Sequence, residues 1–144
     1  MLYNFYDLFV ENGLLEDLYA QELLSTLTVS AIAIAFLVAF AFYIWPLNKV
    51  SFSGFGHWLT MLLVSGGLMF VVTLVTCLQM ANKEIERVPD EPDQGFFFDQ
   101  GGTVFFSFSA EMAVLTFLLF FLISILMKGF SRNAKHRPML WPSK

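Results

Sequence analysis

The sequence predicts an all-α polytopic membrane protein with three transmembrane helices. The 144 residues are 57% hydrophobic and only 14% charged, and the mean hydropathy is +0.66. A soluble domain usually carries about 25% charged residues. The chain also contains three long apolar stretches, and about 20 apolar residues suffice to cross a hydrocarbon core of roughly 30 Å as a helix. The bilayer is therefore the expected solvent for most of this chain.

The three predicted spans cover residues 24–47, 57–79 and 106–129 and belong to a transmembrane domain of residues 23–130. The first two spans contain no Asp, Glu, Lys or Arg. Pro46 is expected to close the first span because it lacks the amide donor that a continuing helix needs. Residues 53–56 read Ser-Gly-Phe-Gly, which predicts a tight turn. We therefore expect the first two spans to form an antiparallel hairpin.

Glu111 interrupts the third predicted span and is the candidate intramembrane or interface carboxylate. A charged group at the bilayer centre costs on the order of a few kcal/mol, so it usually faces a partner or a wet cavity. Two positions fit the sequence: the headgroup level, or more than one turn inside the span. In the second position Glu111 would serve a proton or ion relay, or an inter-subunit ion pair with Lys83 or Arg87.

The distribution of basic residues predicts the orientation. Cytoplasmic loops collect Lys and Arg, and the opposite side of the predicted topology holds only Lys83 and Arg87. The expected location is the bacterial cytoplasmic (inner) membrane, with the N-terminus outside and the C-terminus cytoplasmic. A cleaved signal peptide is not expected, because its basic start is missing before the first span. The basic residues of the first loop and the tail are Lys49, Lys128, Arg132, Lys135, Arg137 and Lys144.

Residues 1–22 predict an amphipathic helix outside the membrane, broken at Asn12-Gly13. Its apolar stripe is expected to lie in the outer interface or, alternatively, to dock onto a partner subunit. Residues 81–104 predict an acidic external loop exposed to solvent. A divalent cation site in that loop is the alternative, although its spacing does not follow the EF-hand pattern. The carboxylates of that alternative site are Asp90, Glu91, Asp93 and Asp99.

Residues 131–144 form a short basic tail, which is expected to fix the topology and to attract anionic lipid. Within it, residues 139–141 read Met-Leu-Trp and could dock onto a cytoplasmic partner.

The residues that chemistry would need are few. Catalysis needs a nucleophile beside a base, paired carboxylates or a metal with several ligands in one pocket. His57 and His136 are the only histidines and Cys77 is the only cysteine. No phosphate-binding, zinc or haem motif occurs, so we expect neither an enzyme nor a cofactor or metal. The formal net charge of -4 argues against a nucleic-acid partner, which needs a concentrated basic face.

Small residues within the spans predict close helix packing. Ala31, Ala35 and Ala39 recur every four residues, and Gly66 and Gly67 lie in the middle of the second span. Small side chains let membrane helices approach closely. These positions are expected to pack the chain's own hairpin or to contact other subunits.

The resulting functional hypothesis is a non-catalytic accessory or scaffold subunit of a larger membrane-embedded assembly, such as an envelope secretion or transport machine. Its expected partners are the lipid bilayer and other membrane-protein subunits. The alternative is a small homo-oligomeric ion channel or ion-coupled permease that uses Glu111.

Overall fold

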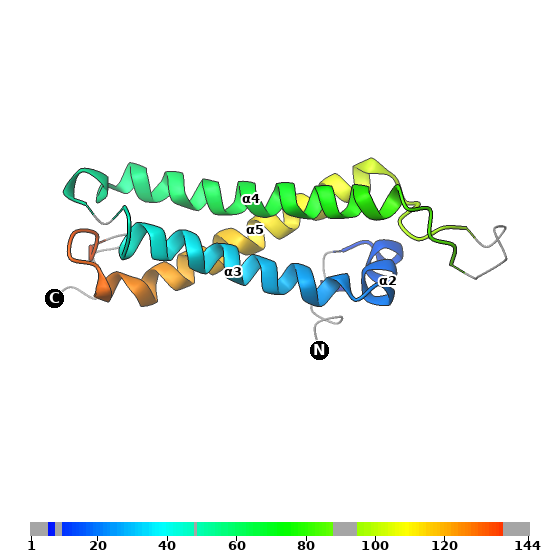
Figure 1. Ribbon diagram of the computed structural model, residues 1–144, viewed down its shortest axis with the longest axis horizontal. Helices are drawn as coiled ribbons and strands as arrows, with labels where there is room; N and C mark the ends of the chain where they lie inside the picture. Colours follow the sequence, from blue (N-terminus) through cyan, green and yellow to red (C-terminus); the bar gives the residue numbers. More distant parts are fainter. Residues whose placement is uncertain (1–5, 8–9, 48, 88–94, 137–144) are drawn as a thin grey trace. The chain divides into compact units, whose positions relative to one another are not determined.

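A computed structural model describes residues 6–7, 10–47, 49–87 and 95–136. The described helices of at least nine residues are α2 (Asn12–Ala20), α3 (Leu23–Tyr43), α4 (Phe55–Ala81) and α5 (Gly102–Met127) (Figure 1). Short 3-10 turns, η1 (Val50–Phe52) and η3 (Lys128–Phe130), follow α3 and α5 along the chain. Three helices are long and apolar enough to cross a membrane. The prediction of an all-helical integral membrane protein with three candidate spans is therefore confirmed at this level.

The candidate spans differ in length. At about 1.5 Å per residue, the 21 residues of α3 extend roughly 31 Å, close to the thickness of a hydrocarbon core. The 27 residues of α4 and the 29 residues of Gly102–Phe130 are longer, so both extend beyond what a perpendicular crossing needs. The α3 helix ends at Tyr43, before residue 47, where the first predicted span ends. Trp45, directly before Pro46, is steered away from helical geometry.

The third long helix begins at Gly102, four residues before the predicted start. Gly101 precedes it with a φ of 92°, a left-handed conformation that glycine adopts without a steric penalty. The amide groups of Val104 and Phe105 both donate to the Gly101 carbonyl oxygen. The turn at Gly101 therefore sets where α5 starts, and Glu111 becomes the tenth residue of the helix.

The contacts divide the chain into two compact units with opposite charge. The acidic unit comprises Met1–Val29 and Phe70–Met112, and the basic unit comprises Ser30–Met69 and Ala113–Lys144. All twelve Asp and Glu residues lie in the acidic unit together with two basic residues, which gives it a formal charge of −10. The basic unit has six basic residues and no acidic one, a formal charge of +6.

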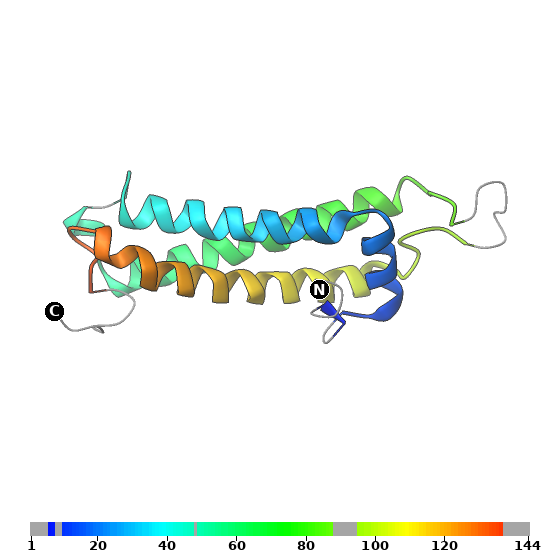
Figure 2. The same cartoon turned by 90° about the horizontal axis from the view of Figure 1, so that it is seen from below.

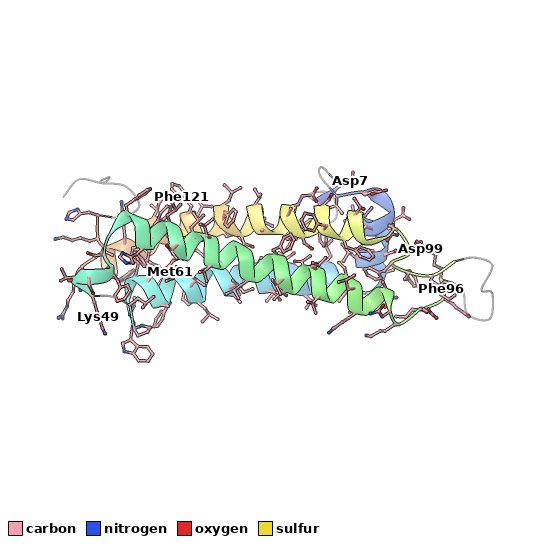
Figure 3. All side chains as sticks on the ribbon, turned by 90° about the horizontal axis from the view of Figure 1, so that it is seen from above. Asp7, Lys49, Met61, Phe96, Asp99 and Phe121 are labelled. Atoms are coloured by element: carbon pink, nitrogen blue, oxygen red, sulfur yellow. The ribbon has the colours of Figure 1, made fainter. Side chains whose placement is uncertain are left out.

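The basic unit has an aromatic core. Ala35 and Ala39 are fully buried, and their small side chains leave room for Trp58 and Phe120, whose ring centroids lie 5.8 Å apart. The Trp58 indole N–H donates to the Ser124 hydroxyl at 3.2 Å, which satisfies a donor that lipid could not. The core also includes Phe42, Tyr43, Met127 and Ala134, and Met61 and Phe121 pack against it (Figure 3).

Two adjacent glycines of α4 have different surroundings within the basic unit. Gly66 is buried, and a Cβ atom at this position would collide with the ring of Phe117. Gly67 is exposed, and a Cβ atom there would meet nothing within 4 Å. Gly66 therefore permits the close approach of α4 to α5 at this point.

The two glycines give a matched test of this packing. Replacing Gly66→Ala should lower the free energy of unfolding by about 1–3 kcal/mol, because the added methyl group overpacks the contact with Phe117. The matched change Gly67→Ala should leave stability unchanged or slightly raise it, because alanine favours helix. Thermal unfolding of both variants in detergent micelles measures the difference. Equal stability of the two variants would contradict the packing described.

Candidate functional site: the Asp17 network and the Glu111 pocket

The apolar side of α2 is buried within the acidic unit. Leu14, Leu15 and Leu18 are all 0% exposed, whereas Tyr19 is 64% exposed. The chain itself thus covers this part of the apolar stripe, which the sequence expected to face lipid or a partner. Figure 2 shows α2 beside the first turns of α3 and α5. The helix begins at Asn12, so the predicted break falls at its start.

A hydrogen bond links the residues before α2 to α3 within the same unit. The hydroxyl groups of Tyr6 and Thr28 lie 3.0 Å apart, and Thr28 in turn donates to the Leu24 carbonyl oxygen. Burial raises the pKa of the Tyr6 phenol, which keeps this hydroxyl protonated.

Asp17 of α2 is the most enclosed charged group among the described residues of the acidic unit. Its side chain is 0% exposed. Its Oδ2 atom accepts hydrogen bonds from the Phe98 backbone N–H at 2.8 Å, the Gln100 side-chain amide at 2.6 Å and the Arg87 guanidinium at 3.1 Å. Oδ1 lies 3.1 Å from the same Arg87 nitrogen but has no hydrogen bond. A buried carboxylate is costly unless it is paired and hydrogen-bonded, and Asp17 is both.

Arg87 joins Asp17 to the loop between α4 and α5. Its Nε donates to the Phe96 carbonyl oxygen at 3.0 Å, its guanidinium lies 3.2 Å from Asp99 Oδ1, and its charge sits 5.5 Å from the centre of the Phe97 ring. A guanidinium suits this role because its donors form a fixed planar fork. Figure 3 shows Phe96 and Asp99 on this loop.

The same loop is held by backbone contacts. Glu86 and Phe96 form an antiparallel bridge, the Phe97 N–H donates to the Ile85 carbonyl oxygen, and the Arg87 N–H donates to that of Gly95. Phe98 has a φ of 61°, a conformation that a bulky residue rarely adopts. In this conformation its N–H reaches Asp17. The described part of the loop is therefore folded onto α2, whereas the sequence predicted a solvated segment.

The predicted cation site in this loop can be followed only in part. Asp90, Glu91 and Asp93 lie outside the described residues, and Asp99 is paired with Arg87. Across residues 6–7, 10–47, 49–87 and 95–136, no group of three His, Cys, Asp or Glu side chains is arranged to hold a metal ion.

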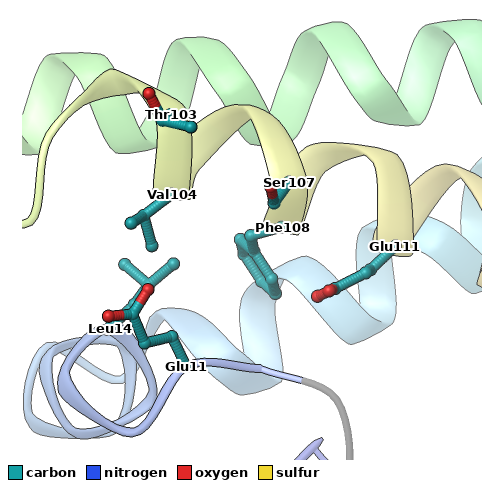
Figure 4. A pocket seen from close by; sticks show the side chains of 7 residues that line it. All are labelled: Glu11, Leu14, Thr103, Val104, Ser107, Phe108 and Glu111. Carbon is teal, nitrogen blue, oxygen red and sulfur yellow. The ribbon is translucent and has the colours of Figure 1, made fainter.

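Glu111 lines a pocket in the acidic unit. The cavity measures about 310 Å³ and is bordered by α5 and the start of α2 (Figure 4). Glu111 is partly buried, and no described residue forms a hydrogen bond or ion pair with its carboxylate. Figure 4 shows its side chain directed into the space beside Phe108. The other lining residues are Glu11, Leu14, Thr103, Val104 and Ser107.

The two basic residues of the acidic unit, Arg87 and Lys83, contact groups other than Glu111. Arg87 is bound to Asp17 and Asp99, and the Lys83 ammonium lies 3.5 Å from the Met80 sulfur. Chemically, the pocket offers two carboxylates and two hydroxyl groups, all able to accept hydrogen bonds, above a floor of apolar side chains. Such a lining can hold a cationic group.

The predicted packing residues of the spans lie in the basic unit and differ in burial. Ala31, Ala35 and Ala39 are each 0% exposed in the basic unit. Gly66 is covered by Phe117, and Gly67 faces open space.

Sequence reasoning did not identify the Asp17 network. The available signal was that Asp17 flanks the apolar positions of α2, and that Arg87 is one of only two basic residues among many acidic ones. Neither signal reveals which carboxylate Arg87 selects, because the two residues are separated by 70 positions.

Two aspartates that share Arg87 provide the test of the network. Asp17→Asn should lower the free energy of unfolding by about 3 kcal/mol, because it removes the buried member of the pair. Asp99→Asn should change it by less than about 1 kcal/mol, because the Asp99 side chain is 50% exposed. Thermal unfolding of each variant in the same detergent measures both effects. A larger loss for Asp99→Asn would refute the central role of Asp17.

Comparison with known proteins identifies no relative from which a function could be inferred. No family model, curated protein or solved structure matches this chain.

Proposed function

We propose that this chain is a non-catalytic accessory or scaffold subunit of a larger membrane-embedded assembly, such as an envelope secretion or transport machine. The observation that carries the proposal is the contrast between two carboxylates of the acidic unit. Asp17 is enclosed by partners from its own chain, while Glu111, on a candidate span, has none among the described residues. Carboxylates in such positions usually pair with a group or face a wet cavity. In this proposal, a second subunit supplies the group that pairs with Glu111.

The proposed location is the bacterial cytoplasmic (inner) membrane, with the N-terminus outside and the C-terminus in the cytoplasm. The separation of charge between the units supports this orientation: six of the eight basic residues belong to the basic unit, which has no acidic residue. Short cytoplasmic segments are enriched in Lys and Arg. The α2 helix and the loop fastened to it then face outward.

The second candidate function is a small homo-oligomeric ion channel or ion-coupled permease, favoured by the acidic pocket itself. A proton relay across the membrane usually needs several ionisable groups at different depths. Glu111 is the only Asp, Glu, Lys or Arg within α3, α4 and α5. The scaffold reading needs only one such group, so it is preferred.

The function is tested by isolating the protein with its partners. The tagged chain, expressed at its native level, is purified in mild detergent, and the intact complex is analysed by mass spectrometry. We expect other membrane proteins in fixed stoichiometry with this chain and absent from an untagged control. A defined oligomer of this chain alone would contradict the scaffold proposal. It would instead favour the channel, which conductance measurements on Glu111→Gln would then examine.

A further inference from the structure

We infer that the Glu111 pocket receives a Lys or Arg side chain from a transmembrane helix of a partner subunit. The inference rests on the proposed function and specifies the chemistry of one contact. Three observations carry it: the position of Glu111 along α5, the composition of the pocket, and the contacts that the two cations of the acidic unit already make.

The first observation concerns depth. Lys128 directly follows α5 and marks the end of its apolar stretch. Counting back about 20 residues, the length needed to cross the hydrocarbon core, reaches the neighbourhood of Phe108. Glu111 then lies about one helical turn, roughly 5 Å, inside the opposite boundary. A long basic side chain on a neighbouring helix can reach a carboxylate at this position along the span.

The second observation is the lining. Glu111 and Glu11 provide negative charge, Thr103 and Ser107 provide hydroxyl acceptors, and Phe108 is buried beneath them. Thr103, Ser107 and Glu11 are exposed, so the pocket can be entered from outside the chain. A cavity of about 310 Å³ accommodates the flexible stem and charged head of one Lys or Arg side chain. The acceptors fit its donors, and the apolar floor fits its methylene groups.

The third observation concerns internal cations. Arg87 is held by two aspartates and a backbone carbonyl group, and losing it from Asp17 would leave a buried charge unpaired. The chain therefore does not release Arg87 to neutralise Glu111. The other cation of the acidic unit, Lys83, has its ammonium 3.5 Å from the Met80 sulfur and forms no ion pair with Glu111 in the described part of the chain. A cation from another polypeptide would pair with Glu111, and this pairing would fix the rotation of the partner helix.

The inference is tested by photo-crosslinking in cells from the pocket wall. A photoreactive amino acid replaces Ser107 in the full-length protein, and the crosslinked peptide is identified by mass spectrometry. We expect adducts with an apolar segment of a different protein that has a Lys or Arg within about one helical turn of the crosslink. The yield should fall about tenfold or more with Glu111→Gln, which removes the charge-assisted contact. Glu111→Asp keeps the charge and should retain most of the yield.

A matched control uses the exposed carboxylate of Glu16, which is on α2 but does not line the pocket. Glu16→Gln makes the same change in charge and should leave the crosslink yield unchanged. A stronger test combines Glu111→Lys with an acidic residue at the partner's basic position, which should restore the adduct that either change alone removes.

The possible outcomes separate this inference from the proposed function. An unchanged yield with Glu111→Gln, no adduct, or adducts only with lipid, with this chain or with a segment lacking Lys and Arg would overturn the pocket assignment. If the purified complex still contains other subunits, the scaffold proposal survives that result. If the chain is isolated without other proteins, the scaffold proposal fails as well.

Discussion

The fully buried carboxylate of Asp17 is stabilised by Arg87 and by two uncharged N–H donors, the Phe98 backbone amide and the Gln100 side-chain amide. Without these groups, burying Asp17 would cost several kcal/mol, so its position and theirs are fixed together. The contacts of Asp17 therefore hold α2 against the loop before α5, including the turn at Phe98. The unusual backbone conformation of Phe98 is maintained because it delivers an N–H to Asp17.

This arrangement gives the Glu111 pocket its shape. The network holds α2 against the loop that leads into α5, and Glu11 and Leu14 of the α2 region form one wall of the cavity. The two acidic side chains consequently have different roles. Asp17 stabilises the unit through its hydrogen bonds and its ion pair, while Glu111 lines the pocket without a hydrogen bond or ion pair to a described residue.

The three-helix architecture could be predicted from composition. Within a bilayer the backbone N–H and C=O groups must form hydrogen bonds inside the protein, and a helix does this without the closed barrel that strands would need. Three apolar stretches thus predicted three long helices. The α5 helix starts four residues before the predicted span because Gly101 sets its start through a local turn that hydropathy does not register. The Asp17–Arg87 pair was missed because it joins positions far apart in the sequence. Glu111 was identified from its cost in lipid, but its pocket depends on α2 and could not be predicted.

The hydrogen bond from Phe98 to Asp17 can be tested by residue-resolved hydrogen exchange at the Phe98 amide, measured by NMR in detergent micelles. We expect this amide to exchange as slowly as the neighbouring Phe97 amide, which is bonded to the Ile85 carbonyl group. Both amides should then exchange faster when Asp17 is replaced by asparagine. Rapid exchange of the Phe98 amide in the unaltered protein, or slow exchange that persists without the Asp17 carboxylate, would show that Asp17 does not hold this loop.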